Sequence, residues 1–337
     1  MAGYEQQRPT NITSRPITFN RTMTNLFFSQ IRSTYKSLDT EEWLDTHFTR
    51  PLGYLWARLF MSLNIHPNTV TILSIFLGIA AGIMFVYQDL LHNIIGVLLL
   101  VWANIYDSCD GQLARMTGKK TRWGRILDGF AGDVWFFFIY LAIIIRLFEQ
   151  PIPFTHISWG IIGVLICLLA GSFFHARQCQ LSDYYRNIHL YFLPDTTSEL
   201  DTSSQQRQLL SDTPKKGNFW WRLFLKSYVK YASTQERLTP SFQALMTYFR
   251  QEQQGHIPNS FRQHFRQQSL PLMKYANIVT FNCRAITLYV ACLTDLPWLY
   301  PVMEITVFTG IASYMHHRHE SMCSRFLIAL RQGKYSA

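Results

Sequence analysis

The sequence predicts an all-α integral membrane protein in which six transmembrane helices follow an interfacial amphipathic helix. The prediction rests on apolar tracts, on the placement of basic residues and on one amphipathic segment. Apolar residues make up 48% of the 337 residues. They gather in six tracts, several of which reach about 20 residues with their flanks, the length needed to cross a hydrocarbon core of about 30 Å. The tracts are Thr71–Val86, Ile94–Ile105, Val134–Leu147, Ile157–Phe174, Ile278–Leu293 and Leu299–Tyr314.

Basic residues follow the pattern of short cytoplasmic loops, which carry an excess of Lys and Arg. The chain has 31 of them, and all except Arg146 and Arg284 lie before the first tract, in alternate connections or after the sixth tract. This pattern predicts a protein of the bacterial inner membrane, or an equivalent membrane, with both termini in the cytoplasm. Topology and anionic lipid headgroups then explain the net charge of +10, and nucleic acid is not an expected partner.

The segment 41–66 carries apolar residues at near-helical spacing among charged ones. Trp43, Leu52, Leu55 and Leu59 belong to this pattern, which suits a helix lying in the membrane interface. A soluble amphipathic helix packed on a cytoplasmic loop is the alternative.

Composition divides the chain into five parts. They are a polar, poorly ordered arm (1–40), the interfacial helix (41–66), transmembrane helices 1–4 with the catalytic motif (67–193), a cytoplasmic insert (194–272), and helices 5–6 with a tail (273–337). Within the insert, Asp195–Gly217 is rich in Ser, Thr, Gln and Asp, which predicts a solvated linker. Asn218–Phe249 interleaves aromatic and basic residues and suits a helix resting against anionic headgroups.

An acidic run beginning between the second and third tracts contains the residues expected to carry chemistry. Charged residues inside membrane segments cost about 2.5–3.5 kcal/mol each at a helix centre, so a cluster of them indicates function. Asp107 and Asp110 are three residues apart, so on a helix they lie about 60° apart and can share one ligand. Gly111 and Ala114 lie on the same side, where small residues allow a helix or a phosphate to approach the backbone.

Three or four carboxylates that converge from two helices would form a hard oxygen site. Mg²⁺ and Mn²⁺ prefer such ligands and also bind substrate phosphates. Two ions could hold a diphosphate, polarise the phosphorus under attack and stabilise the departing phosphate. A buried salt-bridge network with Arg115, Arg122 and Arg125 is the structural alternative, and the combined spacing disfavours it.

The run from Asp107 to Asp133 resembles the signature of the CDP-alcohol phosphotransferase family, D-x2-D-G-x2-A-R-x8-G-x3-D-x3-D. Every element up to Asp128 matches, and Pro67-Asn68-x2-Thr71 resembles the family's entry into its first membrane helix. The resemblance covers about residues 41–190. Members of this family are six-helix membrane enzymes that transfer a substituted phosphate from a CDP-linked donor to an alcohol and release CMP.

The resemblance implies a role for each matching residue and suggests a homodimer. Two Mg²⁺ or Mn²⁺ ions would be held by aspartates, and the CDP moiety would lie among small and polar residues. The implied metal ligands are Asp107, Asp110 and Asp128, with Asp133 as the candidate for the fourth, and the implied CDP-binding residues are Asp107, Gly111, Ala114, Arg115, Gly124 and Thr71.

The chain departs from the family pattern at the fourth aspartate, which in the family is a metal ligand and the base that deprotonates the attacking hydroxyl. Gly132 occupies that position, and Asp133 stands one residue later. On a regular helix, Asp133 would be rotated by about 140° from Asp128, whereas Gly132 would be rotated by only about 40°. We expect a π-bulge near Gly129 or Gly132 to return Asp133 to the site as the base, since such bulges are frequent at functional positions. A three-aspartate site that is inactive or uses another base is the alternative.

The predicted function is transfer of a phosphatidyl group from CDP-diacylglycerol to an alcohol such as inositol phosphate, as in a phosphatidylinositol phosphate synthase. Arg284 in the fifth tract, Arg177 and Arg122 are candidates to bind the acceptor's phosphate, although Arg284 could instead pair with Glu304. Choline- or ethanolamine-type phosphotransfer from a CDP-alcohol to diacylglycerol or ceramide is an alternative. A non-catalytic membrane scaffold is another.

Overall fold

The computed structural model describes residues 29–32, 34–35, 37–119, 121–193 and 200–335, without the side chains of Arg122 and Arg125. The chain divides into two compact units, Met1–Tyr35 and Lys36–Ala337. In the first unit, residues 29–32 are helical. The predicted N-terminal arm therefore lies mostly outside the described residues.

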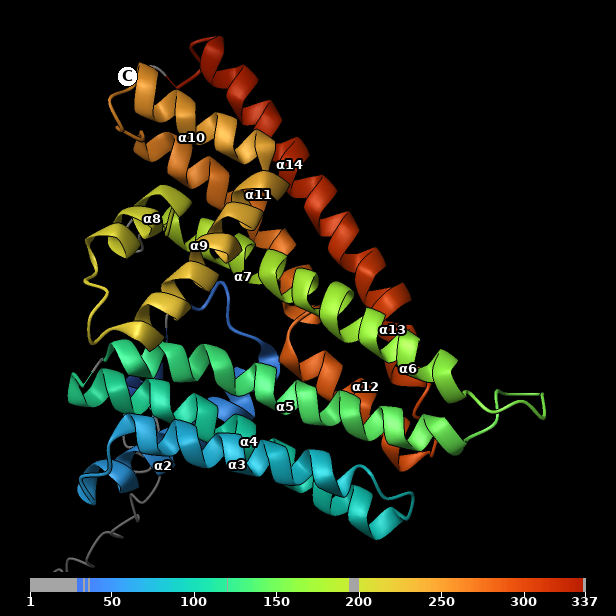
Figure 1. The fold of residues 1–337 in the computed structure, drawn as a ribbon. Coiled ribbons are helices and arrows are strands. Elements are labelled where there is room, and N and C mark those ends of the chain that lie inside the picture. Colours follow the sequence, from blue (N-terminus) through green and yellow to red (C-terminus); the bar gives the residue numbers. More distant parts are fainter. Residues whose placement is uncertain (1–28, 33, 36, 120, 194–199, 336–337) are drawn as a thin grey trace, which may run out of the picture. The chain divides into compact units, whose positions relative to one another are not determined.

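The second unit is built from helices (Figure 1). Its described residues form no β-strand, apart from an isolated bridge between Pro151 and Ser158. Three π-helical segments, η1 to η3, continue directly into α-helices. In chain order the elements are η1 (Asp45–Thr49), α2 (Arg50–Ser62), α3 (Pro67–Met84), α4 (Leu90–Thr117), α5 (Arg122–Glu149), α6 (Gly160–Leu169), η2 (Ala170–His175), α7 (Ala176–Tyr191), α8 (Ser203–Asp212), α9 (Phe219–Leu238), α10 (Pro240–Glu252), α11 (Asn259–Ile278), α12 (Phe281–Leu293), α13 (Leu299–Met303), η3 (Glu304–Phe308) and α14 (Thr309–Arg331).

Five helical stretches of the described residues are long and apolar enough to cross a membrane, which confirms the all-α integral membrane fold. They are Pro67–Met84, Leu90–Thr117, Ile126–Glu149, Gly160–Tyr191 and Asn259–Leu293. The sixth predicted tract, 299–314, is also helical, within α13, η3 and α14, but it is not one of these five. The count of six spans therefore stays a prediction.

Helices α3, α4 and α5 pack tightly together (Figure 1). Two glycines of α3 make the contact with α5 possible. A Cβ atom at Gly78 would lie 2.0 Å from the Trp135 ring, and one at Gly82 would lie 2.7 Å from Phe138 Cβ. Small residues four apart on one face allow membrane helices to approach closely.

Arg146 joins these helices at their other end. Its side chain is 1% exposed and donates hydrogen bonds to Asn93 Oδ1 (2.9 Å), Asp295 Oδ1 (2.5 Å) and the carbonyl oxygens of Phe85 (3.4 Å) and Cys292 (3.3 Å). These partners come from the end of α3, the start of α4 and the end of α12, so one arginine satisfies groups from three separate elements.

The insert is more ordered than its composition predicts. Helices α10 and α11 pack with α7 and α14 around buried phenylalanines such as Phe242 and Phe265. The prediction of a solvated linker over Asp195–Gly217 is wrong for α8, which begins with a capping box formed by Thr202 and Gln205. A capping box satisfies two backbone donors that a helix start leaves free, and so stabilises a polar segment as a helix.

Candidate functional site

Three helix ends meet because the connections between them are short. Pro67 occupies the first turn of α3, where its fixed φ suits a helix start, and the His66 side chain accepts a hydrogen bond from the next backbone N–H. Gly118 ends α4 with a left-handed φ of 69°. Thr121 then caps α5 by accepting from the backbone N–H of Gly124 at 2.8 Å. The start of α3, the end of α4 and the start of α5 thus lie at the same end of the bundle.

Three of the predicted aspartates converge at this end. Asp107 and Asp110 come from α4 and Asp128 comes from α5, and one carboxylate oxygen of each lies within 4.8 Å of the others. Asp110 is buried, and the Thr71 hydroxyl of α3 donates to its Oδ2 at 2.5 Å. Asp128 is the most exposed of the three. The site therefore draws on three helices.

This group has the chemistry of a divalent cation site. Its donors are all carboxylate oxygens, which are the ligands that Mg²⁺ and Mn²⁺ prefer. Among the described side chains, neither Asp107 nor Asp110 forms an ion pair with Arg115. The side chains of Arg122 and Arg125 lie outside the described set.

The predicted nucleotide-binding residues surround the carboxylates. The Arg115 guanidinium folds over Gly111, where a Cβ atom would lie 3.5 Å from its two terminal nitrogens. The Arg115 Nε atom is buried and has no hydrogen-bond partner among the described residues. Ala114 is partly buried on the same helix, and Gly124 packs so closely on Asn68 that a Cβ atom would come within 2.9 Å of its Oδ1. A buried donor without a partner is costly, which suits a site that receives a polar ligand.

Charged residues of the interfacial segment, which its apolar pattern did not predict as site residues, also lie beside the site. Asp45 and Arg50 are charged neighbours of Asp107. Arg50 is held by Glu41, to which it donates at 3.0 and 3.1 Å. Glu42 is buried, and this desolvation raises the pKa of its carboxyl. The four charged residues between positions 41 and 50 were the sequence signal that could have identified this part of the site.

Asp133 does not join the group. Helix α5 is a regular α-helix from Arg122 to Glu149, so the predicted π-bulge at Gly129 or Gly132 is wrong. Five residues on a regular helix turn the Asp133 side chain about 140° away from Asp128. Its charged neighbour is His175 of η2. The assignment of Asp133 as metal ligand and base is corrected accordingly, because no π-bulge returns its side chain to the metal group.

The site has room at the family's fourth position. A Cβ atom at Gly132 would have no neighbour within 4 Å, and the same holds at Gly129. Both glycines lie within four residues of Asp128 on α5. Open space therefore adjoins the exposed carboxylate.

Arg284 is paired inside the protein. It is completely buried and donates to Glu304 Oε2 (2.5 Å), Gln178 Oε1 (2.7 Å) and His175 Nδ1 (2.8 Å). These contacts correct its assignment to acceptor binding, since a paired arginine without exposed surface cannot meet a substrate phosphate. Arg177 is exposed and lies 4.5 Å over the Phe173 ring, so its role stays a prediction. The prediction for the Arg122 side chain falls outside the described residues.

Comparisons with known proteins show which family this part of the chain resembles. Residues 64–185 match the family model described as CDP-alcohol phosphatidyltransferase. A protein of Aquifex aeolicus described as uncharacterized is 32% identical over 120 residues, which are 34% of this chain and 53% of that protein. Archaetidylinositol phosphate synthase of Pyrococcus horikoshii is 39% identical over 72 residues, which are 21% of this chain and 37% of that enzyme. The chain thus spans about half the length of one curated relative and over a third of the other.

Proposed function

We propose that this protein transfers a phosphatidyl group from CDP-diacylglycerol to an alcohol and releases CMP, because residues 64–185 match the CDP-alcohol phosphatidyltransferase family model. The observation that carries the proposal is the convergence of Asp107, Asp110 and Asp128 from two helices. Inositol phosphate is the acceptor we favour, and the name of the Pyrococcus horikoshii relative supports this choice.

The three aspartates would hold two divalent cations, Mg²⁺ or Mn²⁺, whose charge would neutralise the diphosphate and favour departure of CMP. Thr71 orients Asp110 through its hydrogen bond, which fixes one carboxylate oxygen and leaves the other available. Arg115 has an unpaired Nε donor and can bind a phosphate oxygen of the donor where Gly111 leaves the backbone accessible.

In the reaction, the acceptor oxygen forms a bond to the phosphorus that carries the lipid. The bond from that phosphorus to the bridging oxygen breaks, and CMP leaves with the bridging oxygen. The proton of the acceptor hydroxyl passes to Asp128, because this carboxylate is the most exposed of the three and adjoins the open space at Gly129 and Gly132.

The test is CMP release by the purified full chain from CDP-diacylglycerol, with Mg²⁺ or Mn²⁺ and a panel of alcohols that includes inositol phosphate. Asp107→Asn and Asp110→Asn should each abolish turnover while the protein still inserts into the membrane. Asp212→Asn, an exposed acidic position on α8, is the matched control and should retain full activity. Retained turnover in either site variant would contradict the proposal.

A non-catalytic role is the second candidate, and Gly132 is the observation that favours it. A chain with three aspartates could bind a CDP-linked lipid without activating an acceptor. Metal-dependent binding of CDP-diacylglycerol with no CMP release from any acceptor would establish this role. Choline- or ethanolamine-type transfer would instead appear as CMP release from a CDP-alcohol with diacylglycerol.

Orientation and assembly are further parts of the proposal. The placement of basic residues supports a site and termini on the cytoplasmic side. We also propose a homodimer. The orientation of the termini is tested by the protease accessibility of tags at the two termini in sealed vesicles. The homodimer is tested by the mass of the purified protein in detergent.

A further inference from the structure

The two helices α8 and α9 form an antiparallel hairpin held at both ends. At one end, Ser203 donates from its backbone N–H to Glu236 at 2.8 Å and from its hydroxyl to the same carboxylate at 2.5 Å. At the other end, Arg222 donates to the carbonyl oxygens of Leu210, at 2.8 Å, and Thr213. The hairpin is therefore a defined platform for the side chains on its surface.

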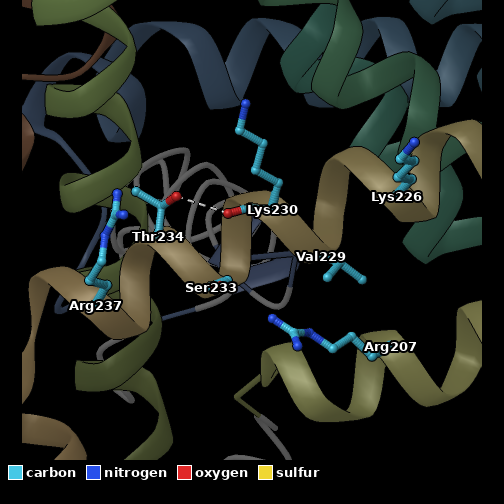
Figure 2. Close-up of a pocket in the computed structure, with 7 residues that line it drawn as sticks. All are labelled: Arg207, Lys226, Val229, Lys230, Ser233, Thr234 and Arg237. Carbon is cyan, nitrogen blue, oxygen red and sulfur yellow. Dashed lines mark hydrogen bonds between the residues drawn. The ribbon is translucent and has the colours of Figure 1, made fainter.

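A cationic groove lies on this hairpin (Figure 2). Its volume is about 350 Å³, and Arg207 reaches towards it from α8 while the other lining residues come from α9. The lining residues are Arg207, Lys226, Val229, Lys230, Ser233, Thr234 and Arg237. The Thr234 hydroxyl is used within the helix, where it donates to the Lys230 carbonyl at 2.9 Å. Four cations thus border a space that no carboxylate lines.

The acidic groups of the hairpin are already engaged. Asp201 accepts from the Tyr228 hydroxyl at 2.7 Å, Glu236 accepts from Ser203, and Asp212 accepts from the Ser211 hydroxyl at 3.2 Å. In the part of the chain that the structure describes, none of the four groove cations forms an ion pair. The groove therefore presents positive charge that the hairpin does not neutralise.

The same face of α9 carries exposed apolar residues at its start. Phe219 is 68% exposed and Leu223 is 47% exposed. At 100° per residue, both fall with Lys226, Lys230 and Arg237 in a sector of about 60° around the helix axis. A helix that lies on anionic lipid places apolar side chains in line with its cations, which is the pattern of this face of α9.

We propose that the α8–α9 hairpin binds an anionic phospholipid, with the lipid phosphate in the cationic groove and the start of α9 against the acyl chains. Charge complementarity selects an anionic headgroup, and the apolar residues in the same sector select a lipid over a free phosphate. The chain is an integral membrane protein, so anionic lipid is present at high local concentration. Basic residues near a membrane surface attract anionic lipid individually and additively.

The experiment titrates dioctanoyl phosphatidylglycerol into the purified full chain in zwitterionic detergent, with dioctanoyl phosphatidylcholine and inorganic phosphate as comparisons. The variant K226Q/K230Q should bind phosphatidylglycerol roughly thirtyfold more weakly, since two cations are lost. K215Q/K216Q, with the same charge change outside the groove on the same hairpin, is the matched control and should bind as the wild type does.

Phe219→Ser distinguishes the two sources of phosphate. It should weaken phosphatidylglycerol binding about tenfold, because it removes an apolar contact, and leave any binding of inorganic phosphate unchanged. Equal binding by K226Q/K230Q and the wild type would overturn the proposal. So would effective competition by inorganic phosphate together with no effect of Phe219→Ser, because the groove would then be a free-anion site.

Discussion

The substitution Gly132→Asp tests how the site handles the acceptor's proton. On the regular helix α5, position 132 lies about 40° around the axis and about 6 Å along it from Asp128. A side chain there meets nothing within 4 Å of its Cβ atom, and Asp is a better helix residue than Gly. The new carboxylate should therefore reach the open space beside Asp128 without a steric clash.

A well-placed general base contributes about 10²- to 10⁴-fold to a rate, and Asp128 already supplies part of this. We expect Gly132→Asp to raise CMP release from CDP-diacylglycerol by roughly tenfold to a hundredfold. Gly132→Asn has nearly the same shape without the charge and should leave the rate within twofold of the wild type. A second readout is Mn²⁺ affinity, which a fourth carboxylate should increase.

Asp133→Asn completes the test. Because Asp133 faces away from the metal group on the regular helix, this change should leave turnover within about threefold of the wild type. A loss of a hundredfold or more in Asp133→Asn, together with no gain in Gly132→Asp, would refute the reasoning. The functional helix would then differ from the regular one.

Three further outcomes are expected. Arg284→Met should lower the free energy of unfolding by about 3–5 kcal/mol, because it leaves Glu304 charged and buried without its partner. The double variant Arg284→Met/Glu304→Leu should regain most of that stability, and the KM of every acceptor should stay unchanged. Gly78→Ala should lower the thermal midpoint and the free energy of unfolding, the latter by about 1–3 kcal/mol, since the new Cβ atom would overlap the Trp135 ring. Gly129→Ala is the control and should not lower the thermal midpoint, because open space surrounds that position. A hydrogen bond from Arg266 holds the pKa of the Asp39 carboxyl below its usual value, so the ionised carboxylate stabilises the fold at neutral pH. Asp39→Asn should therefore lower the thermal midpoint at pH 7. The difference in thermal midpoint between the variant and the wild type should narrow as the pH falls below about 4, because Asp39 then becomes protonated in the wild type.

Much of the site was predictable because its geometry is local. Asp107 and Asp110 share a helix face by their spacing alone, and a connection of four residues between α4 and α5 brings Asp128 back to the same end. The family resemblance implied that Thr71 binds the CDP moiety, whereas its hydrogen bond to Asp110 was not predicted. The charges of the interfacial segment were missed because their proximity to Asp107 depends on how that segment packs on α4.

The insert shows how composition misled the prediction. Ser, Thr, Gln and Asp residues are common in linkers, and Asp195–Gly217 is rich in them. Yet Thr202 and Gln205 have the spacing of a capping box, and this local signal marked a helix start within the predicted linker. The packing of α8 on α9 then stabilises the helix, and no periodicity within α8 reveals that contact.

The π-helical segments were the least predictable elements, and their positions indicate what they do. Each of the three carries a charged or titratable residue, which is Asp45 in η1, His175 in η2 and Glu304 in η3, and of these Glu304 is fully buried. Segments η2 and η3 contact each other, and both direct a side chain at Arg284. Since a π-turn rotates the following side chains relative to an α-turn, it can bring a polar group to a buried partner from another helix. In η2 and η3, the π-turns thus coincide with side chains that contact a buried arginine from another helix.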